Sequence, residues 1–472
     1  KVSTNITFSD NVTATTGLTV SAGTAAYNVV FNGASNTIAG TTTFSNTGTV
    51  TLGNDSSDSI TFTGGVTATA PSQVNLAGTT KATNSAISLG DSNTPIVLTA
   101  NTTVDGNTAG NITLGGTVNG AFALTLNTTG TTTLSAVIGG TTALASITTN
   151  TGGTVAINGG AITTTGTQTY NDAATLGANT TLTTTSNGDI TFASTLDSGV
   201  AGKTLTISTN GTGDTTFTGA VGTTALGNIT ITTDVLTAAA IKLAGTLSVT
   251  NAASSSITGI ISDGASAAAL THAGTATLTL SGVNTYTGAT TINSGATLAL
   301  STAGAIAASS SVAANGTFDI QAVTTSASIK SLSGSGTAYL GTKLLNLTAA
   351  NDTFSGAISN ANGDLTVSAG TETLTGVNTY IGNTTIASGA TLIIGSTGKL
   401  GGATGSYAGN IANDGTFKYS SSSDQTLTGI ISGAGSITKD TSATSTLTLQ
   451  GANTYSGGTT VTAGILKANV SS

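Results

Sequence analysis

The 472-residue chain contains no Cys, Met or Trp, and all ten of its basic residues are lysine. Without cysteine, the protein can form neither a disulfide framework nor a thiolate zinc site, and it cannot use a cysteine nucleophile. A histidine-based metal cluster is excluded as well, because His272 is the single histidine. We therefore expect no catalytic residue, no metal ligand and no cofactor.

Charge is also scarce, since charged residues make up 6% of the chain and the net charge is −8. The lysines are isolated, as at Lys203, Lys242 and Lys330, whereas a phosphate-binding surface needs clustered cations. No window of about 18 uncharged apolar residues is present, so we expect no membrane-spanning helix. With 37% hydrophobic residues and little charge, the chain should fold, and nucleic acid is not expected as a partner.

Threonine and glycine are abundant, with 108 Thr and 64 Gly against two Pro. Threonine is β-branched and favours strands, while glycine supplies the turns between them. Segments 59–62, 189–192, 204–207 and 277–280 alternate small polar and apolar residues, and Asn-Gly pairs such as 187–188 lie between such segments. The pattern predicts an all-β protein of many short strands.

One block of sequence occurs three times, at 282–298, 376–392 and 451–466, and contains Gly-x-Asn-Thr-Tyr-x-Gly each time. The third copy departs from the pattern after its last glycine. The intervals between the three tyrosines are unequal, which favours a solenoid with variable loops over a propeller. A carbohydrate-stacking role for the tyrosines is the alternative to packing at a corner of the coil. We assign a structural role to the motif residues Asn284, Tyr286, Gly288, Asn378, Tyr380, Gly382, Asn453, Tyr455 and Gly457.

A looser motif, Thr-Phe-(Thr/Ser)-Gly-x-aliphatic, recurs at 61–66, 216–221 and 353–358. It extends the repetitive character to the N-terminal half. We therefore predict one solenoid in two parts: residues 1–250 with loose repeats, and residues 251–472 with the three blocks.

The three blocks resemble the autotransporter-associated β-strand repeat of secreted bacterial passenger domains. The stretch 167–221 is similar to repeats of filamentous haemagglutinin-like surface proteins. These resemblances imply a right-handed parallel β-helix, or β-solenoid, located outside the cell or on the bacterial cell surface. They also imply a role in adhesion, surface coating or fibre formation.

In a parallel β-helix, successive coils stack about 4.8 Å apart and pair through their backbones. The alternation predicts inward-facing aliphatics, outward rows of threonine, and asparagine stacked at the corners. The residues expected inside are Ile292, Leu298, Leu300, Ile386, Leu392 and Ile394.

Few residues suggest chemistry. His272 is expected to be an exposed or core-edge turn residue, because it has no cluster of reactive partners. Asp55 and Asp58 could hold calcium, but an ordinary polar turn is favoured, because the glycine and glutamate of an EF-type loop are missing. Glycoside hydrolysis usually needs two carboxylates, yet Glu372 is the single glutamate and there is no arginine. We expect no enzyme, and keep a polysaccharide-active β-helix enzyme as a distant alternative.

The ends of the chain suggest self-association. Residues 1–8 and 463–470 have strand-like sequence without a cap, which predicts head-to-tail pairing with other copies of the chain. The main functional hypothesis is therefore a structural or adhesive solenoid that self-assembles into a fibre, sheath or layer. The alternative is a monomeric adhesin passenger that binds a cell-surface or glycan ligand.

Overall fold

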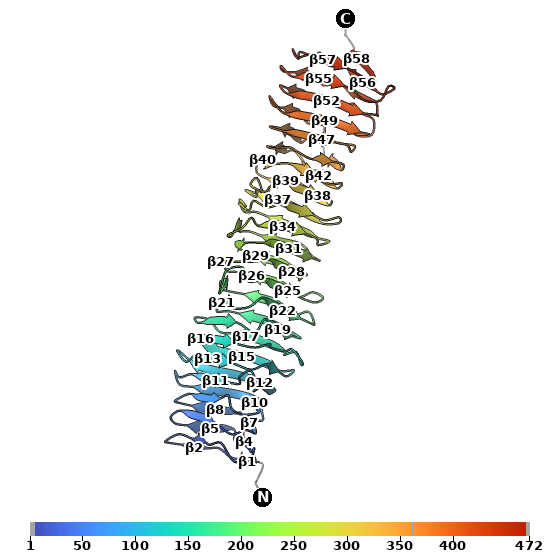
Figure 1. Cartoon of the computed structure of the whole chain (residues 1–472). Helices are drawn as coiled ribbons and strands as arrows, with labels where there is room; N and C mark the ends of the chain where they lie inside the picture. Colours follow the sequence, from blue (N-terminus) through green and yellow to red (C-terminus); the bar gives the residue numbers. More distant parts are fainter. Residues whose placement is uncertain (1–4, 360–361, 469–472) are drawn as a thin grey trace. The chain divides into compact units, whose positions relative to one another are not determined.

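The computed structural model describes residues 5–359 and 362–468, which fold into short parallel β-strands arranged as a β-solenoid (Figure 1). The structure divides into an N-terminal unit, Lys1–Ala244, and a C-terminal unit, Gly245–Ser472. No helix in the described part of the chain is long and apolar enough to cross a bilayer. The all-β parallel solenoid predicted from the sequence is confirmed. Its right-handed sense stays a prediction.

The N-terminal unit consists of three parallel ladders, each formed by one side of successive coils. Ladder N1 contains β1 (Asn5–Phe8), β4 (Asn28–Phe31), β7 (Thr49–Leu52), the first half of β10 (Gln73–Ala82), the first half of β12 (Ile96–Asn107) and β14 (Val118–Asn119). Bridges at Ile138 continue it to β19 (Ala161–Thr164), β22 (Thr180–Thr184), β25 (Leu205–Ser208) and β28 (Ile229–Thr233).

Ladder N2 runs along a second side of the same coils. It contains β2 (Thr13–Ala14), β5 (Ser35–Ile38), β8 (Ser59–Phe62), the second halves of β10 and β12, β15 (Ala123–Thr128), β17 (Ser146–Thr149), β20 (Gln168–Tyr170), β23 (Ile190–Phe192), β26 (Thr215–Phe217) and β29 (Leu236–Ala238).

Ladder N3 forms the third side. It contains β3 (Thr19–Val20), β6 (Thr42–Phe44), β9 (Val66–Ala68), β11 (Ile87–Leu89), β13 (Ile112–Leu114), β16 (Thr131–Leu134), β18 (Thr154–Ile157), β21 (Ala173–Leu176), β24 (Leu196–Ser198), β27 (Val221–Leu226) and β30 (Ile241–Leu243).

The C-terminal unit repeats this plan. Ladder C1 contains β31 (Thr246–Asn251), β34 (Ala269–His272), β36 (Thr290–Ile292), β38 (Val312–Ala314) and β41 (Leu332–Ser333). A bridge between Gly334 and Phe354 continues it to β44 (Thr353–Phe354), β47 (Thr371–Leu374), β49 (Thr391–Ser396), β52 (Thr416–Ser421), β55 (Ser436–Lys439) and β57 (Thr459–Val461).

Ladders C2 and C3 form the other two sides. Ladder C2 contains β32 (Ser255–Ile257), β35 (Thr277–Leu280), β37 (Thr297–Thr302), β39 (Thr317–Val323), β42 (Thr337–Tyr339) and β45 (Ala357–Ser359). Ladder C3 contains β40 (Ser326–Ile329), β43 (Leu344–Leu347), β46 (Asp364–Val367), β48 (Thr384–Ile386), β51 (Ile411–Asn413) and β54 (Ile431–Ser432). The remaining strands are β33 (Ile261–Asp263) and a ladder of β50 (Ser406–Tyr407), β53 (Gln425–Leu427), β56 (Thr446–Leu449) and β58 (Ile465–Ala468).

Loops absorb much of the irregular spacing of the sequence, and bulges within strand pairs such as β10–β12 and β37–β39 absorb more of it. The coil that joins Ser326 to its partner Leu344 is short, whereas the coil that joins Thr384 to its partner Ile411 is much longer. Strands such as β7 and β35 alternate half-buried and buried residues along their whole length. The aliphatics predicted to point inward, Ile292, Leu298, Leu300, Ile386, Leu392 and Ile394, are all fully buried. Each such side chain contributes about 1.5–3 kcal/mol through burial.

Aromatic rings also stack along the inside of the N-terminal unit. Tyr170, Phe192 and Phe217 occupy the same register position in three successive strands of ladder N2. Their ring centroids are 4.7 and 5.5 Å apart, and the rings are nearly parallel. A stack of this kind adds about 0.5–1.5 kcal/mol per pair beyond area burial.

The prediction that threonine rows line the outside is wrong for a subset of threonines, which are buried. Thr184 and Thr209 lie inside, where their hydroxyls donate to the carbonyls of Gly188 and Gly213 at 2.6 Å. These two carbonyls lie in turns outside the strands, and a buried hydroxyl donates a hydrogen bond to each of them. Threonine thus serves both faces of these strands.

Candidate functional site

Each of the three sequence blocks closes one coil of the solenoid. The strand just before the block pairs in parallel with the strand at its end: β35 with β37, β47 with β49, and β56 with β58. In the first copy, Thr277 therefore lies beside Thr297 and Leu278 beside Leu298. The block and the strand that precedes it thus form one complete coil, whose end stacks on its beginning.

The motif asparagine joins three consecutive coils. Asn284 accepts the Ile261 N–H of the preceding coil at 2.8 Å, and its amide donates to Gly282 at 2.9 Å and to Ala305 of the following coil at 3.0 Å. Asn378 makes the same three contacts with Ile358, Gly376 and Lys399. Both side chains are buried, and their hydrogen bonds add to the backbone pairing between these coils.

The motif residues of the third copy are less buried. Asn453 accepts the Ile431 N–H at 2.8 Å, and its side chain is half-buried. The motif tyrosines follow the same trend, because Tyr286 and Tyr380 are buried whereas Tyr455 is half-buried. In all three copies the tyrosine hydroxyl is hydrogen-bonded to the threonine four residues later, at 2.6 to 2.9 Å. Buried rings cannot stack on a sugar, so Tyr286 and Tyr380 are packing residues.

The motif glycine is required by the close approach of two coils. A Cβ added at Gly457 would lie within 3.0 Å of the Gly435 carbonyl oxygen, and one added at Gly288 or Gly382 would be equally close to a carbonyl oxygen. Its neighbour Gly458 has nothing within 4 Å of the corresponding position. The chain therefore offers two adjacent glycines with opposite steric demands.

We expect Gly457→Ala to lower the free energy of unfolding by about 1–3 kcal/mol, because the backbone must shift to admit the methyl group. Gly458→Ala should leave it within about 0.5 kcal/mol of the parent value. Urea denaturation followed by far-UV circular dichroism would measure both. Equal effects of the two substitutions would contradict the steric argument.

The second block starts on a different side of the three-sided coil from the first. Its leading strand β47 belongs to ladder C1, the ladder that also contains β36, the middle strand of the first block. The leading strand of the first block, β35, belongs to ladder C2 instead. The block can therefore occupy more than one side of the solenoid, and its corner loop faces a different direction in each case.

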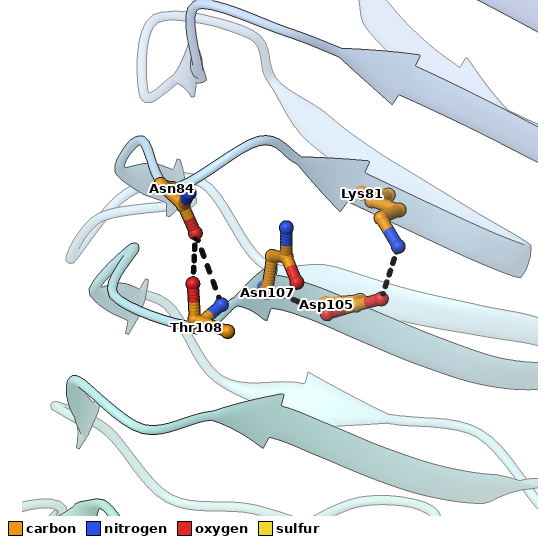
Figure 2. A network of polar contacts seen from close by, with 5 residues as sticks. All are labelled: Lys81, Asn84, Asp105, Asn107 and Thr108. Carbon is orange, nitrogen blue, oxygen red and sulfur yellow. Dashed lines mark hydrogen bonds and ion pairs between the residues drawn. The ribbon is translucent and has the colours of Figure 1, made fainter.

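Asparagine and aspartate form vertical chains at the corners, as predicted for asparagine. The Asp364 carboxylate accepts the Asn383 N–H at 2.6 Å, Asn383 accepts from Asn410 at 3.1 Å, and Asn410 accepts from Ile430 at 2.9 Å. The same arrangement links Asn84 to Thr108, through both the N–H and the hydroxyl (Figure 2). Corners lack ladder hydrogen bonds, so these oxygens replace them.

Figure 2 also shows the ion pair between Lys81 and Asp105, whose charged atoms are 3.1 Å apart on neighbouring strands of ladder N2. Asp105 additionally accepts the Asn107 N–H at 2.7 Å. Both side chains are partly exposed, so the pair contributes about 0–1 kcal/mol. The aspartates named here are thus engaged in holding the backbone.

An unbroken column of hydroxyl groups runs along the outside of ladder N2. Pairing places one serine or threonine at the same outward position in ten successive coils. We call it the hydroxyl column: Ser35, Ser59, Thr79, Thr103, Thr125, Thr148, Thr169, Thr191, Thr216 and Thr237. Its members are half-exposed or exposed. Sequence reasoning missed it, because irregular spacing hides the vertical register.

The expectation for His272 is wrong. It is fully buried at the end of β34, an inward position between Val249 and Ile292, and is neither exposed nor in a turn. Its Nε2 lies 2.6 Å from the Asn251 side-chain oxygen, and its Nδ1 has no partner. The period-2 pattern was available to place it, because Leu270 points the same way. Burial lowers the pKa of His272 to about 4.

This burial predicts a loss of stability in acid. The pKa of His272 is lowered from 6.5, so its contribution is present above pH 6.5 and is lost as the pH falls towards 4. The loss should reach about 3 kcal/mol at roughly 1.4 kcal/mol per pKa unit. In His272→Gln that part of the acid dependence should disappear. Urea midpoints at pH 7 and 4 would show it, and an unchanged pH dependence in the variant would refute it.

Asp55 and Asp58 form a polar turn. Asp58 accepts the N–H groups of Asn54 and Asp55 at 2.8 and 3.1 Å, and Asp55 accepts from the N–H and hydroxyl of Ser57. These bonds from Ser57 lower the pKa of Asp55. Within the described residues, no group of three or more His, Cys, Asp or Glu side chains could hold a metal ion.

Comparison with known proteins identifies the blocks. The passenger-associated-transport-repeat model matches residues 270–300, 367–394 and 444–468, and each match contains one block. The chain is 35% identical over 237 residues to the adhesin BmaC autotransporter of Brucella suis biovar 1 (strain 1330). That alignment covers 43% of this chain and 7% of the relative, so the chain spans a small part of that protein's length. No solved structure matches the chain. The chain carries passenger-associated transport repeats and is distantly homologous to an autotransporter adhesin.

Proposed function

We propose that the chain is a segment of an autotransporter-type passenger that is displayed on the bacterial cell surface and adheres to host or neighbouring cells. The match to the transport repeat and the similarity to an adhesin carry this proposal. The fold supports it, because each repeat closes one coil and leaves the outward positions free to vary.

The outward-facing side chains suggest which kind of partner the surface binds. The hydroxyl column presents donors and acceptors with almost no charge, and neighbouring coils are about 4.8 Å apart. Such a surface suits a neutral, hydrogen-bonding partner such as a glycan. Contacts of this kind are little screened by salt, because screening acts on charges. A non-enzymatic role fits this surface, since binding needs no reactive group.

The test is an adhesion assay with beads that carry the purified chain, applied to cultured animal cells and to bacterial cells. We expect adhesion above that of uncoated beads, with little change between low and high salt. A variant with Thr125, Thr148 and Thr169 changed to valine keeps the side-chain shape and the strand preference but removes three hydroxyl groups from the hydroxyl column. It should fold normally and adhere less. Adhesion equal to that of uncoated beads would overturn the proposal.

Head-to-tail association with other copies of the chain stays a prediction. The similarity to an adhesin favours the monomeric passenger over a fibre subunit. Sedimentation velocity over a hundredfold range of concentration would separate the two, because a fibre subunit would form fast-sedimenting species.

A further inference from the structure

The single glutamate occupies a core position in the second transport repeat. Glu372 is fully buried in β47, where it points to the same side as Leu374. The equivalent residues of the first and third repeats are Leu278 and Leu447, which are also fully buried. A carboxyl group thus replaces a leucine at a site that two sister repeats keep apolar.

The surroundings of Glu372 compensate poorly for its burial. Neither carboxyl oxygen has a hydrogen-bond partner. Leu392 of β49 lies beside it on one side. On the other side the pairing of Thr373 with Thr353 places Asp352 next to it, just before β44. Strands β44 and β49, which pair with β47, contain no titratable residue, and Asp352 is the charged residue that precedes β44.

Burial and the neighbouring Asp352 charge both favour the protonated form of Glu372. Burial, together with the charge of Asp352, raises the pKa of Glu372 from 4.5 to about 9, and the nearby Leu332 N–H opposes the shift. A lone carboxylate at this position would leave an unpaired charge in an apolar core, which is among the costliest arrangements in a protein. The carboxyl group therefore keeps its proton at neutral pH while the coil is closed.

We propose that Glu372 makes the coil of the second transport repeat a pH-sensitive element, which stays packed while the carboxyl group is protonated and opens locally when the proton is lost. Opening lets the carboxylate reach water and releases one proton. The first and third repeats carry leucine and lack this response. As a consequence, the coil of the second repeat is stably closed in acid and opens more often under alkaline conditions.

The direction and size of this pH dependence follow from the linkage between proton binding and coil opening. A raised pKa in the closed state means that the stabilisation is complete below pH 4.5 and is lost as the pH rises towards 9. Between these limits, the equilibrium constant for opening should rise about tenfold per pH unit. From pH 5 to pH 8 the increase is therefore about a thousandfold.

Hydrogen exchange of the full chain, read by mass spectrometry and corrected for intrinsic rates, tests this on matched peptides. Peptides from 364–394 should show an opening constant with a slope of about one in log units against pH, whereas peptides from 277–300 should be flat above pH 6.5, where the neighbouring His272 is neutral in the open and the closed coil. Glu372→Leu, which restores the sister sequence, should abolish the slope, and Glu372→Gln should do the same without changing the side-chain shape. Leu278→Glu should transfer the slope to the first repeat.

The outcomes separate cleanly. A flat profile in the parent chain would overturn the proposal, and so would an equal slope in Glu372→Leu. Should Leu278→Glu prevent folding, the two Glu372 variants still decide the question, because both remove a buried ionisable group.

Discussion

Replacing Asn378 with alanine is expected to lower the free energy of unfolding of the C-terminal unit by about 2–4 kcal/mol. The substitution removes three hydrogen bonds, made with Ile358, Gly376 and Lys399. Leaving a buried backbone group without its partner costs about 1–3 kcal/mol, and here the fully buried Ile358 loses the acceptor of its N–H group. Urea denaturation monitored by circular dichroism measures the loss, and hydrogen exchange should place it in the three coils that the side chain joins.

The third repeat provides the control. Asn453 is half-buried and accepts one backbone hydrogen bond, from Ile431. Asn453→Ala should therefore cost about 1 kcal/mol or less. If Asn453→Ala were as damaging as Asn378→Ala, the bridging of coils would not be the source of the stability.

Phe192→Ala is expected to have the largest effect in the N-terminal unit, a loss of about 3–5 kcal/mol in the free energy of unfolding. The ring is buried between Tyr170 and Phe217, with centroid distances of 4.7 and 5.5 Å. Its removal leaves a cavity and breaks both ring contacts at once. Neighbouring coils cannot collapse into the cavity, because their spacing is fixed by backbone pairing.

Phe122→Ala is the matched control, because Phe122 is half-buried in the same unit. We expect it to cost about 1 kcal/mol, since part of its ring is still in contact with water in the folded chain. The two variants are compared by urea denaturation at equal protein concentration. Similar losses would mean that the aromatic stack adds nothing beyond ordinary contact.

The sequence was sufficient to predict the inward aliphatics, because a period of two residues leaves no choice of face once a strand is recognised. Ile292 and Leu298 are examples. The same rule would have placed His272 and Glu372 inside, since each shares its face with a leucine two residues away. Both were missed because residue type was weighed above position.

Other features could not be predicted from the sequence. The bridging role of Asn378 depends on partners about one coil away on each side, whose register is set by loop lengths. The hydroxyl column is hidden for the same reason, because the length of chain between strand partners differs from one coil to the next.

The closure of each block upon itself has an evolutionary consequence. A gene duplication that copies residues 277–296, the coil from Thr277 to just before its partner Thr297, would insert a layer whose strand already matches its neighbours, because β35 and β37 pair directly in the stack. The inserted layer would add about 4.8 Å to the reach of the molecule without requiring any new contact surface. Unequal recombination could therefore lengthen or shorten such a protein one layer at a time, and every intermediate length would remain foldable.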